Sequence, residues 1–139
     1  MKVSNSYKQY RIMQEFKELI SEFYPGKVSL LDFFIMQHIA YCGEEGTTQY
    51  DLSKALYITP ARINPVIKRL ESDEMITIEV DDTTRRIRKI LTVTEKGKQI
   101  VDSVVRRSFE VIGETREENP QQLEAFEAYL DKMFITVAS

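Results

Sequence analysis

Apolar and polar residues follow two different rhythms along the middle of this chain. In residues 47–56 and 59–71 the apolar positions recur every three or four residues, which predicts two short helices. From Ile76 to Val80 apolar and polar residues alternate, and residues 87–93 do so more roughly, so two strands are expected there. Thr94 is suited to cap a further helix. The predicted order is therefore helix, helix, strand, strand, helix.

The residues between these elements fit the same order. Thr59 is a good N-cap, and Pro60 suits the first helical position, where its missing N–H costs nothing. Residues 81–84, Asp-Asp-Thr-Thr, favour a tight turn because their side chains bond back to the backbone. Two helices followed by a hairpin make a winged helix-turn-helix, which usually places its second helix in the DNA major groove. We therefore predict this fold for residues 43–97.

Further helices with wide apolar stripes are predicted on both sides of this segment. The stripes consist of Tyr7, Tyr10, Met13, Phe16, Ile20 and Phe23, then Val101, Val104, Val105, Val111 and Ile112, and finally Leu123, Phe126, Leu130, Met133, Phe134 and Val137. The central segment is too small to cover them, so they should pack on each other and on a second copy. Residues 1–42 and 98–139 are thus predicted to form the dimerisation region of a single domain, 1–139. A twofold dimer would match a palindromic DNA site.

Residues 30–42 are apolar on most sides and predict a central helix, capped by Ser29. The preceding segment, residues 24–26, is interpreted as a helix-ending turn with no further role. His38 and Cys42 lie on the central helix. For them a packed imidazole and an inert thiol are favoured over a ligand-binding histidine and a redox sensor.

Composition excludes several other classes of protein. With 139 residues, 42% hydrophobic and 29% charged, the chain fits one globular domain. There is no apolar run of about 20 residues and no signal-peptide pattern, and the single cysteine favours a reducing cytoplasm. No phosphate loop or nucleophile motif is present, and one His with one Cys makes a zinc site improbable. We therefore expect no enzyme, no cofactor and no metal.

The net charge of −3 hides an uneven distribution. Between Tyr50 and Lys98 there are ten basic and eight acidic residues, a balance of +2, whereas the rest of the chain has a balance of −5. Residues 83–89 hold four basic residues and no acid. A solvated surface is the alternative interpretation, but local Lys and Arg at this place favour contact with DNA phosphates.

Four short motifs in this region resemble signatures of one bacterial family. They are residues 43–53 with Thr48-Gln49-Tyr50-Asp51-Leu52, residues 67–71 followed by Met75-Ile76, Arg85-Arg86, and residues 93–97, Val-Thr-Glu-Lys-Gly. They resemble the multiple-antibiotic-resistance-regulator (MarR) family of transcription factors. The resemblance implies a triangular homodimer on a pseudo-palindromic operator, more often a repressor, released from DNA by a small molecule, metal or oxidant. The alternative is a winged-helix module that binds protein and has lost DNA binding.

The candidate DNA-binding residues follow from the helix and hairpin geometry. Ile63, Val66, Ile67 and Leu70 should face inward, which turns the other side of the helix outward. The candidates are Ala61, Arg62, Asn64, Pro65, Lys68 and Arg69 on the recognition helix, and Thr84, Arg85, Arg86 and Arg88 on the wing. Arg62, Asn64 and Lys68 are expected to read bases. Arg69 is expected to contact a phosphate or a partner within the protein.

Two positions depart from the family pattern. Thr84 stands where the family usually has an acid before the wing arginines, so the wing is expected to be looser. Pro65 lies inside the recognition helix, where it removes a hydrogen bond and clashes with the carbonyl of Ala61, at roughly 3 kcal/mol. The helix is expected either to kink there or to begin its regular part at Asn64.

An effector site is also predicted, for an apolar or aromatic small molecule. It would lie in the cleft between the dimerisation helices and the DNA reader, lined by aromatic bodies with a few polar tips. The candidates are Tyr10, Met13, Phe34, His38 and Tyr41. The alternative is that these side chains simply complete the core.

Overall fold

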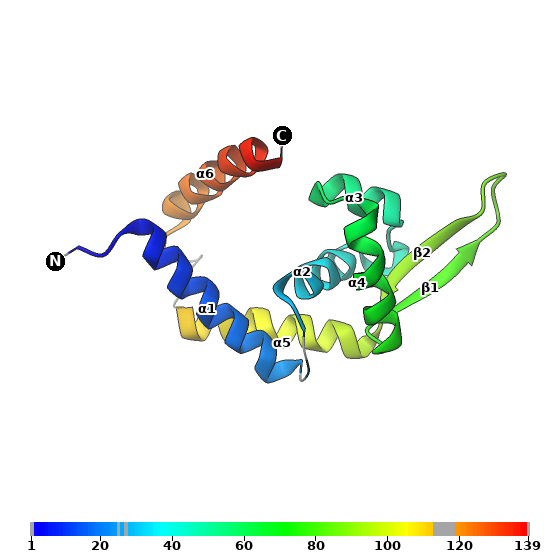
Figure 1. Ribbon diagram of the computed structural model, residues 1–139, viewed down its shortest axis with the longest axis horizontal. Helices are drawn as coiled ribbons and strands as arrows, with labels where there is room; N and C mark the ends of the chain where they lie inside the picture. The colour runs from blue at the N-terminus through cyan, green and yellow to red at the C-terminus, as the bar shows by residue number, and fades with distance from the viewer. Residues whose placement is uncertain (1, 25, 27, 113–118, 139) are drawn as a thin grey trace.

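The computed structural model describes residues 2–24, 26, 28–112 and 119–138, and these are mainly helical with one antiparallel hairpin (Figure 1). This confirms the predicted winged helix-turn-helix with flanking helices. The elements are α1 (Asn5–Phe23), α2 (Leu30–Tyr41), the 3-10 helix η1 (Gly43–Glu45), α3 (Gln49–Leu56), α4 (Pro60–Ser72), β1 (Ile76–Asp81), β2 (Arg88–Val93), α5 (Glu95–Ile112) and α6 (Pro120–Ala138).

Hydroxyl side chains fix the starts of several helices. The Ser29 side chain accepts the Asp32 N–H, and the Thr48 side chain accepts the Asp51 N–H, each at 3.1 Å. At α5 the Thr94 hydroxyl accepts the Gly97 N–H at 3.1 Å and donates to the Glu74 carbonyl at 2.7 Å. Such caps satisfy N–H groups that the helix itself leaves without partners. The caps predicted at Ser29 and Thr94 are therefore confirmed.

Helix α2 lies at the centre of the core, as its apolar sequence predicts. Its side chains Phe33, Ile35, Met36 and Ile39 are fully buried, and it packs against α1, α3, α4, α5 and β2. The inward face of α4 is buried as expected, at Ile63, Val66, Ile67 and Leu70. The buried face of α4 therefore packs on the core around α2, and its other face remains available for DNA.

The hairpin pairs Ile76 with Val93 at its base and Asp81 with Arg88 near its tip. Thr47 forms an isolated bridge with Leu91, which ties the entrance of α3 to β2. Ile87 was expected in the second strand, but β2 begins at Arg88 and Ile87 is exposed in the tip. An apolar residue there has no core to reach, because the tip extends beyond the body of the molecule (Figure 1).

Helix α4 runs without interruption from Pro60 to Ser72, with Pro65 inside it. The expectation that its regular part begins at Asn64 is therefore wrong. The first turn is formed because the Thr59 carbonyl accepts the N–H groups of Arg62 and Ile63, at 3.0 and 3.1 Å. Apolar side chains are buried on both sides of the proline, and each such side chain contributes roughly 1.5–3 kcal/mol. That burial offsets the cost of about 3 kcal/mol for an internal proline.

The end of α1 is more than a turn. Tyr24 is buried, and its hydroxyl donates to Asp73 Oδ2 at 2.6 Å, at the end of α4. Burial, followed by this hydrogen bond, raises the pKa of Tyr24, so it stays a neutral donor. The interpretation that this segment has no further role is wrong. Sequence patterns did not reveal the contact because its partners are 49 residues apart.

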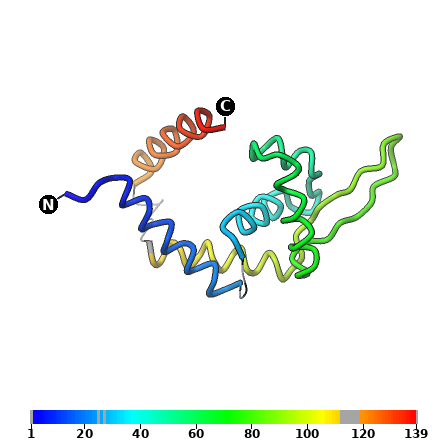
Figure 2. Tube along the Cα trace, viewed as in Figure 1, coloured from blue at the N-terminus to red at the C-terminus, as the bar shows by residue number. Residues whose placement is uncertain are grey.

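The first half of α1 and all of α6 leave apolar side chains uncovered. The C-terminal half of α1 packs on α5 and buries Leu19 and Ile20, whereas Tyr7, Tyr10 and Met13 are exposed. Helix α6 has no buried residue, and most of its trace lies apart from the rest of the molecule (Figure 2). Phe134 of α6 forms an edge-to-face pair with Tyr57 at the end of α3, with ring centroids 5.7 Å apart.

Candidate nucleic-acid interface

The turn between α3 and α4 sets the position of the candidate recognition helix. Tyr57 ends α3 in the left-handed conformation, with φ of 54°. The Ser53 hydroxyl donates to the Ile58 carbonyl, and the Ile58 N–H donates to the Ser53 carbonyl at 3.2 Å. These two bonds close the turn, after which Thr59 and Pro60 start α4.

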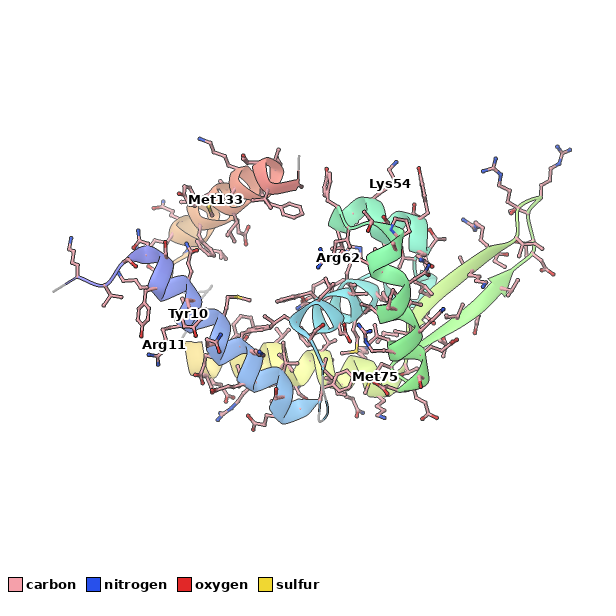
Figure 3. All side chains as sticks on the ribbon, in the orientation of Figure 1. Tyr10, Arg11, Lys54, Arg62, Met75 and Met133 are labelled. Atoms are coloured by element: carbon pink, nitrogen blue, oxygen red, sulfur yellow. The ribbon has the colours of Figure 1, made fainter. Side chains whose placement is uncertain are left out.

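The outward face of α4 has the predicted composition. Ala61, Arg62, Asn64, Pro65, Lys68 and Arg69 are all exposed. Arg62 lies on the half of α4 nearer to the α3–α4 turn, whereas Met75 lies beyond the other end of the helix (Figure 3). The exposed face therefore presents the cationic side chains of Arg62 and Lys68 and the amide of Asn64. Arg69 is a third cation on this face.

Arg69 is engaged within the protein. Its Nε and its terminal nitrogen NH2 donate to the two carboxylate oxygens of Asp32, at 2.9 and 2.8 Å. Asp32 is only 4% exposed, and it also accepts the Ser29 hydroxyl at 2.7 Å. The hydrogen bonds to Asp32 raise the pKa of Arg69. Of the two roles predicted for Arg69, the structure contains the intraprotein one, and it ties α4 to α2.

Asn64 also has a partner, on the neighbouring helix. The Gln49 side-chain Nε2 donates to Asn64 Oδ1 at 2.6 Å. Gln49 is the first residue of α3, so this bond joins the two helices of the helix-turn-helix at their exposed side. Gln49 belongs to one of the sequence motifs, but the motif alone does not indicate this contact.

The wing carries its arginines in two settings. Arg85 and Arg86 are exposed in the tip, where the Thr84 hydroxyl donates to the Arg86 carbonyl at 2.9 Å. Arg88 forms an ion pair with Asp81 at 3.0 Å across the base of the tip. The Asp81 carboxylate also accepts the hydroxyl and N–H of Thr83. Those Thr83 bonds first, and then Arg88, lower the pKa of Asp81 to about 2. An acid thus does brace a wing arginine, although it precedes Arg85 by four residues.

The base of the hairpin contacts α4, and the wing extends outward from there (Figure 1). Helix α4 runs from the α3 turn towards the base of the hairpin, and the hairpin then runs back (Figure 1). Its tip therefore lies on the same side of the molecule as the N-terminal end of α4. The four basic residues of the tip, Arg85, Arg86, Arg88 and Lys89, are all exposed.

The five candidate effector residues occupy different settings in the single chain. Tyr10 and Met13 are exposed on α1, and Tyr41 is exposed and bonded to Gln37. Phe34 is half-buried and stacks on Phe16 at 5.6 Å, and His38 is also half-buried. Tyr41 borders a shallow hollow of about 300 Å³ that is otherwise lined by α5, at Val101, Asp102, Val105, Arg106 and Phe109.

The described ranges contain neither a metal-binding cluster nor a membrane-spanning helix. No group of three or more His, Cys, Asp or Glu residues among them could hold a metal ion. No helix in this described part is long and apolar enough to cross a membrane. Cys42 is half-buried at the end of α2.

Comparison with known proteins identifies the fold. No protein-family model matches the chain, and no curated protein matches it in sequence. Several solved structures, however, superpose on this chain. A protein of Listeria monocytogenes described as a MarR-family transcriptional regulator, in complex with a 26-mer DNA, superposes with a TM-score of 0.70 at 21% identity, over 98% of this chain and 92% of its own. MepR of Staphylococcus aureus in complex with DNA gives 0.65 at 24% identity, over 97% and 99%. MepR bound to ethidium bromide gives 0.55 at 23% identity, over 97% of both chains.

These observations define a winged helix-turn-helix protein with additional long helices at both ends. The chain has the fold of the MarR-type regulators over nearly its whole length.

Proposed function

We propose that this protein is a cytoplasmic transcriptional regulator that binds a pseudo-palindromic DNA operator as a homodimer, and represses by occupying it. The observation that carries the proposal is the exposed polar face of α4 beside a basic wing tip. Arg62, Asn64 and Lys68 supply the donors and acceptor that base edges require, and Arg85 and Arg86 supply positive charge for phosphates.

The dimer is supported by apolar surface that the single chain does not cover. On α6, Phe126, Leu130 and Phe134 are 57%, 42% and 48% exposed. On α1, Tyr7 and Tyr10 are 47% and 56% exposed. Contiguous apolar faces of this kind mark interfaces in soluble proteins. A second copy has the same faces to cover, and a twofold pair would present two readers to a palindrome.

The alternative, a winged helix that binds protein and has lost DNA binding, depended on Pro65 and on the negative total charge. Helix α4 is continuous through Pro65, and its outward side chains are exposed on both sides of that residue. The two acids nearest the wing tip are Asp81 and Asp82. The charge of Asp81 is balanced by its ion pair with Arg88, so these acids do not make the tip negative. DNA binding is therefore the better-supported function.

Selection of bound sequences from random duplex DNA tests the proposal. The expected result is enrichment of one inverted repeat, with binding that weakens steeply as salt rises. Failure of the protein to enrich any duplex, together with capture of no DNA at low salt, would contradict it.

Two arginine substitutions should separate phosphate contact from base reading. Arg86→Ala should weaken binding to all sequences and flatten the dependence of log affinity on log salt by about one unit, because one phosphate contact is lost. Arg62→Ala should instead remove about 1–3 kcal/mol of discrimination at one position of each half-site. Fluorescence anisotropy with single-base operator variants at several salt concentrations measures both effects.

An unchanged affinity and an unchanged salt slope for both Arg85→Ala and Arg86→Ala would mean that the wing does not contact DNA. An equal loss of affinity on every sequence for Arg62→Ala would make Arg62 a backbone contact.

We further propose that an apolar or aromatic ligand releases the DNA. It would bind between the dimerisation helices and the reader, near Tyr10, Met13, Phe34, His38 and Tyr41. MepR, which has a similar structure, is bound to ethidium bromide in one of its solved structures, and ethidium is an aromatic ligand. Titration of a panel of aromatic compounds should find one that weakens operator binding, and operator DNA should weaken its binding by the same factor. Loss of DNA binding on peroxide treatment that Cys42→Ser abolishes, or a response to divalent metal alone, would contradict this proposal.

A further inference from the structure

Gln49 contacts the only amide side chain of helix α4. Its Nε2 donates to Asn64 Oδ1 at 2.6 Å, slightly shorter than the usual N–H···O distance. Gln49 is half-buried, whereas Asn64 is exposed on the outward face. The two residues belong to different helices, so the bond fixes one reader side chain from a neighbouring element.

The direction of this bond restricts the Asn64 amide. A side-chain amide has an oxygen with two lone pairs and a nitrogen with two hydrogens. In the observed arrangement Oδ1 receives the Gln49 N–H, so turning over the Asn64 amide alone would place an N–H against an N–H. One lone pair of Oδ1 and the Nδ2 hydrogens remain for a ligand. Adenine presents the complementary pair in the major groove, the N6 donor beside the N7 acceptor.

We propose that Gln49 is a positioning residue for sequence specificity, which holds Asn64 in the orientation that reads adenine. This inference rests on the proposed DNA-binding function. An exposed asparagine otherwise samples several rotamers and both amide orientations, and it must give up that freedom when it binds a base. Gln49 removes part of this freedom before DNA arrives, so the correct base gains affinity over the others.

The test compares Gln49→Met, Asn64→Ala and the double variant with the wild type, by selection from random duplex DNA. Methionine has the length of glutamine but cannot donate the bond. Gln49→Met should lower the preference for adenine at one position of each half-site by about two- to ten-fold, the worth of one hydrogen bond. The salt dependence should stay unchanged, because the substitution removes no charge. Asn64→Ala should lose the same preference, and adding Gln49→Met to it should change nothing further.

Two further variants separate positioning from a general effect on the fold. Gln49→Glu supplies only acceptors, so it should turn the Asn64 amide over and lower the adenine preference at least as far as Gln49→Met. Lys54→Met is the matched control, since Lys54 is exposed on the same helix and has no bond to α4 in the described structure. It should leave the base preference at every position as in the wild type.

The possible results are distinct. Base preferences of Gln49→Met that equal those of the wild type would overturn the positioning role alone. Equal weakening on all sequences would also overturn it, because Gln49 would then contact the DNA backbone and not position a base reader. If the wild type itself enriches no sequence, the proposed function fails, and the inference fails with it.

Discussion

Deletion of residues 120–139 is expected to abolish the proposed dimer and, with it, binding to a full palindrome. It removes the apolar stripe of α6, which consists of Leu123, Phe126, Leu130, Met133 and Phe134. Each of these side chains contributes roughly 1.5–3 kcal/mol when fully buried, so the stripe is the largest single source of dimer stability that we identify. The truncated chain should be monomeric or poorly soluble, because the exposed apolar half of α1 then has no α6 helix to pack against. Sedimentation velocity measures the outcome.

A milder variant keeps the test valid if the truncated chain does not stay in solution. Phe126→Glu combined with Leu130→Glu retains α6 and places two charges on its exposed apolar face. It should give a soluble monomer, since an unpaired charge in a buried interface costs several kcal/mol. Lys132→Gln, on the opposite face of α6, should remain dimeric. A stable dimer from the truncated chain, or from the double Glu variant, would contradict the proposed architecture.

Gly97→Ala is expected to destabilise the fold by about 3 kcal/mol, near the upper end for an overpacked core. A Cβ at this position would lie 2.4 Å from the Met75 carbonyl oxygen and 2.8 Å from Val93 Cγ2. The oxygen cannot easily move, because it accepts the Thr94 N–H at 2.9 Å and the Thr94 hydroxyl at 3.1 Å. We expect the midpoint of thermal unfolding to fall by roughly 10 °C.

Gly43→Ala is the control for this variant. Gly43 has a positive φ of 66°, but a Cβ there would meet nothing within 4 Å. It should therefore cost only the backbone strain of about 1 kcal/mol. Gly97 has no positive φ, so the difference between the two variants isolates the steric contact with Met75 and Val93. Calorimetric losses of equal size for both variants would contradict this account of Gly97.

The order and kind of the elements could be predicted because they depend on short-range rules. Thr59-Pro60 starts α4, Ser29 caps α2, and the alternation from Ile76 to Val80 gives β1, all from residues within one turn or one strand. The inward face of α4 followed from the helical period alone. The exposed half of α1 and the uncovered α6 also agree with the amphipathic pattern, which predicts an apolar face but does not name what covers it.

The contacts that orient the site could not be predicted because they join distant parts of the chain. Asp32 appeared to be an acid in the first turn of α2, yet folding brings it to Arg69, 37 residues away. Asp81 appeared only as a turn residue, although it braces Arg88. The effect of Pro65 was misjudged for a related reason. Local rules give the cost of a proline but not the burial of Ile63, Val66 and Ile67 that holds the helix together.

The central claim is that two copies of this chain bind one palindromic duplex through α4 and the wing. The most direct measurement is the molar mass of the complex at saturation, by sedimentation equilibrium, with the duplex enriched by the wild-type protein. We predict a mass of two chains per duplex, with binding that weakens as salt rises. One chain per duplex, or no complex at low salt with any enriched duplex, would contradict the claim.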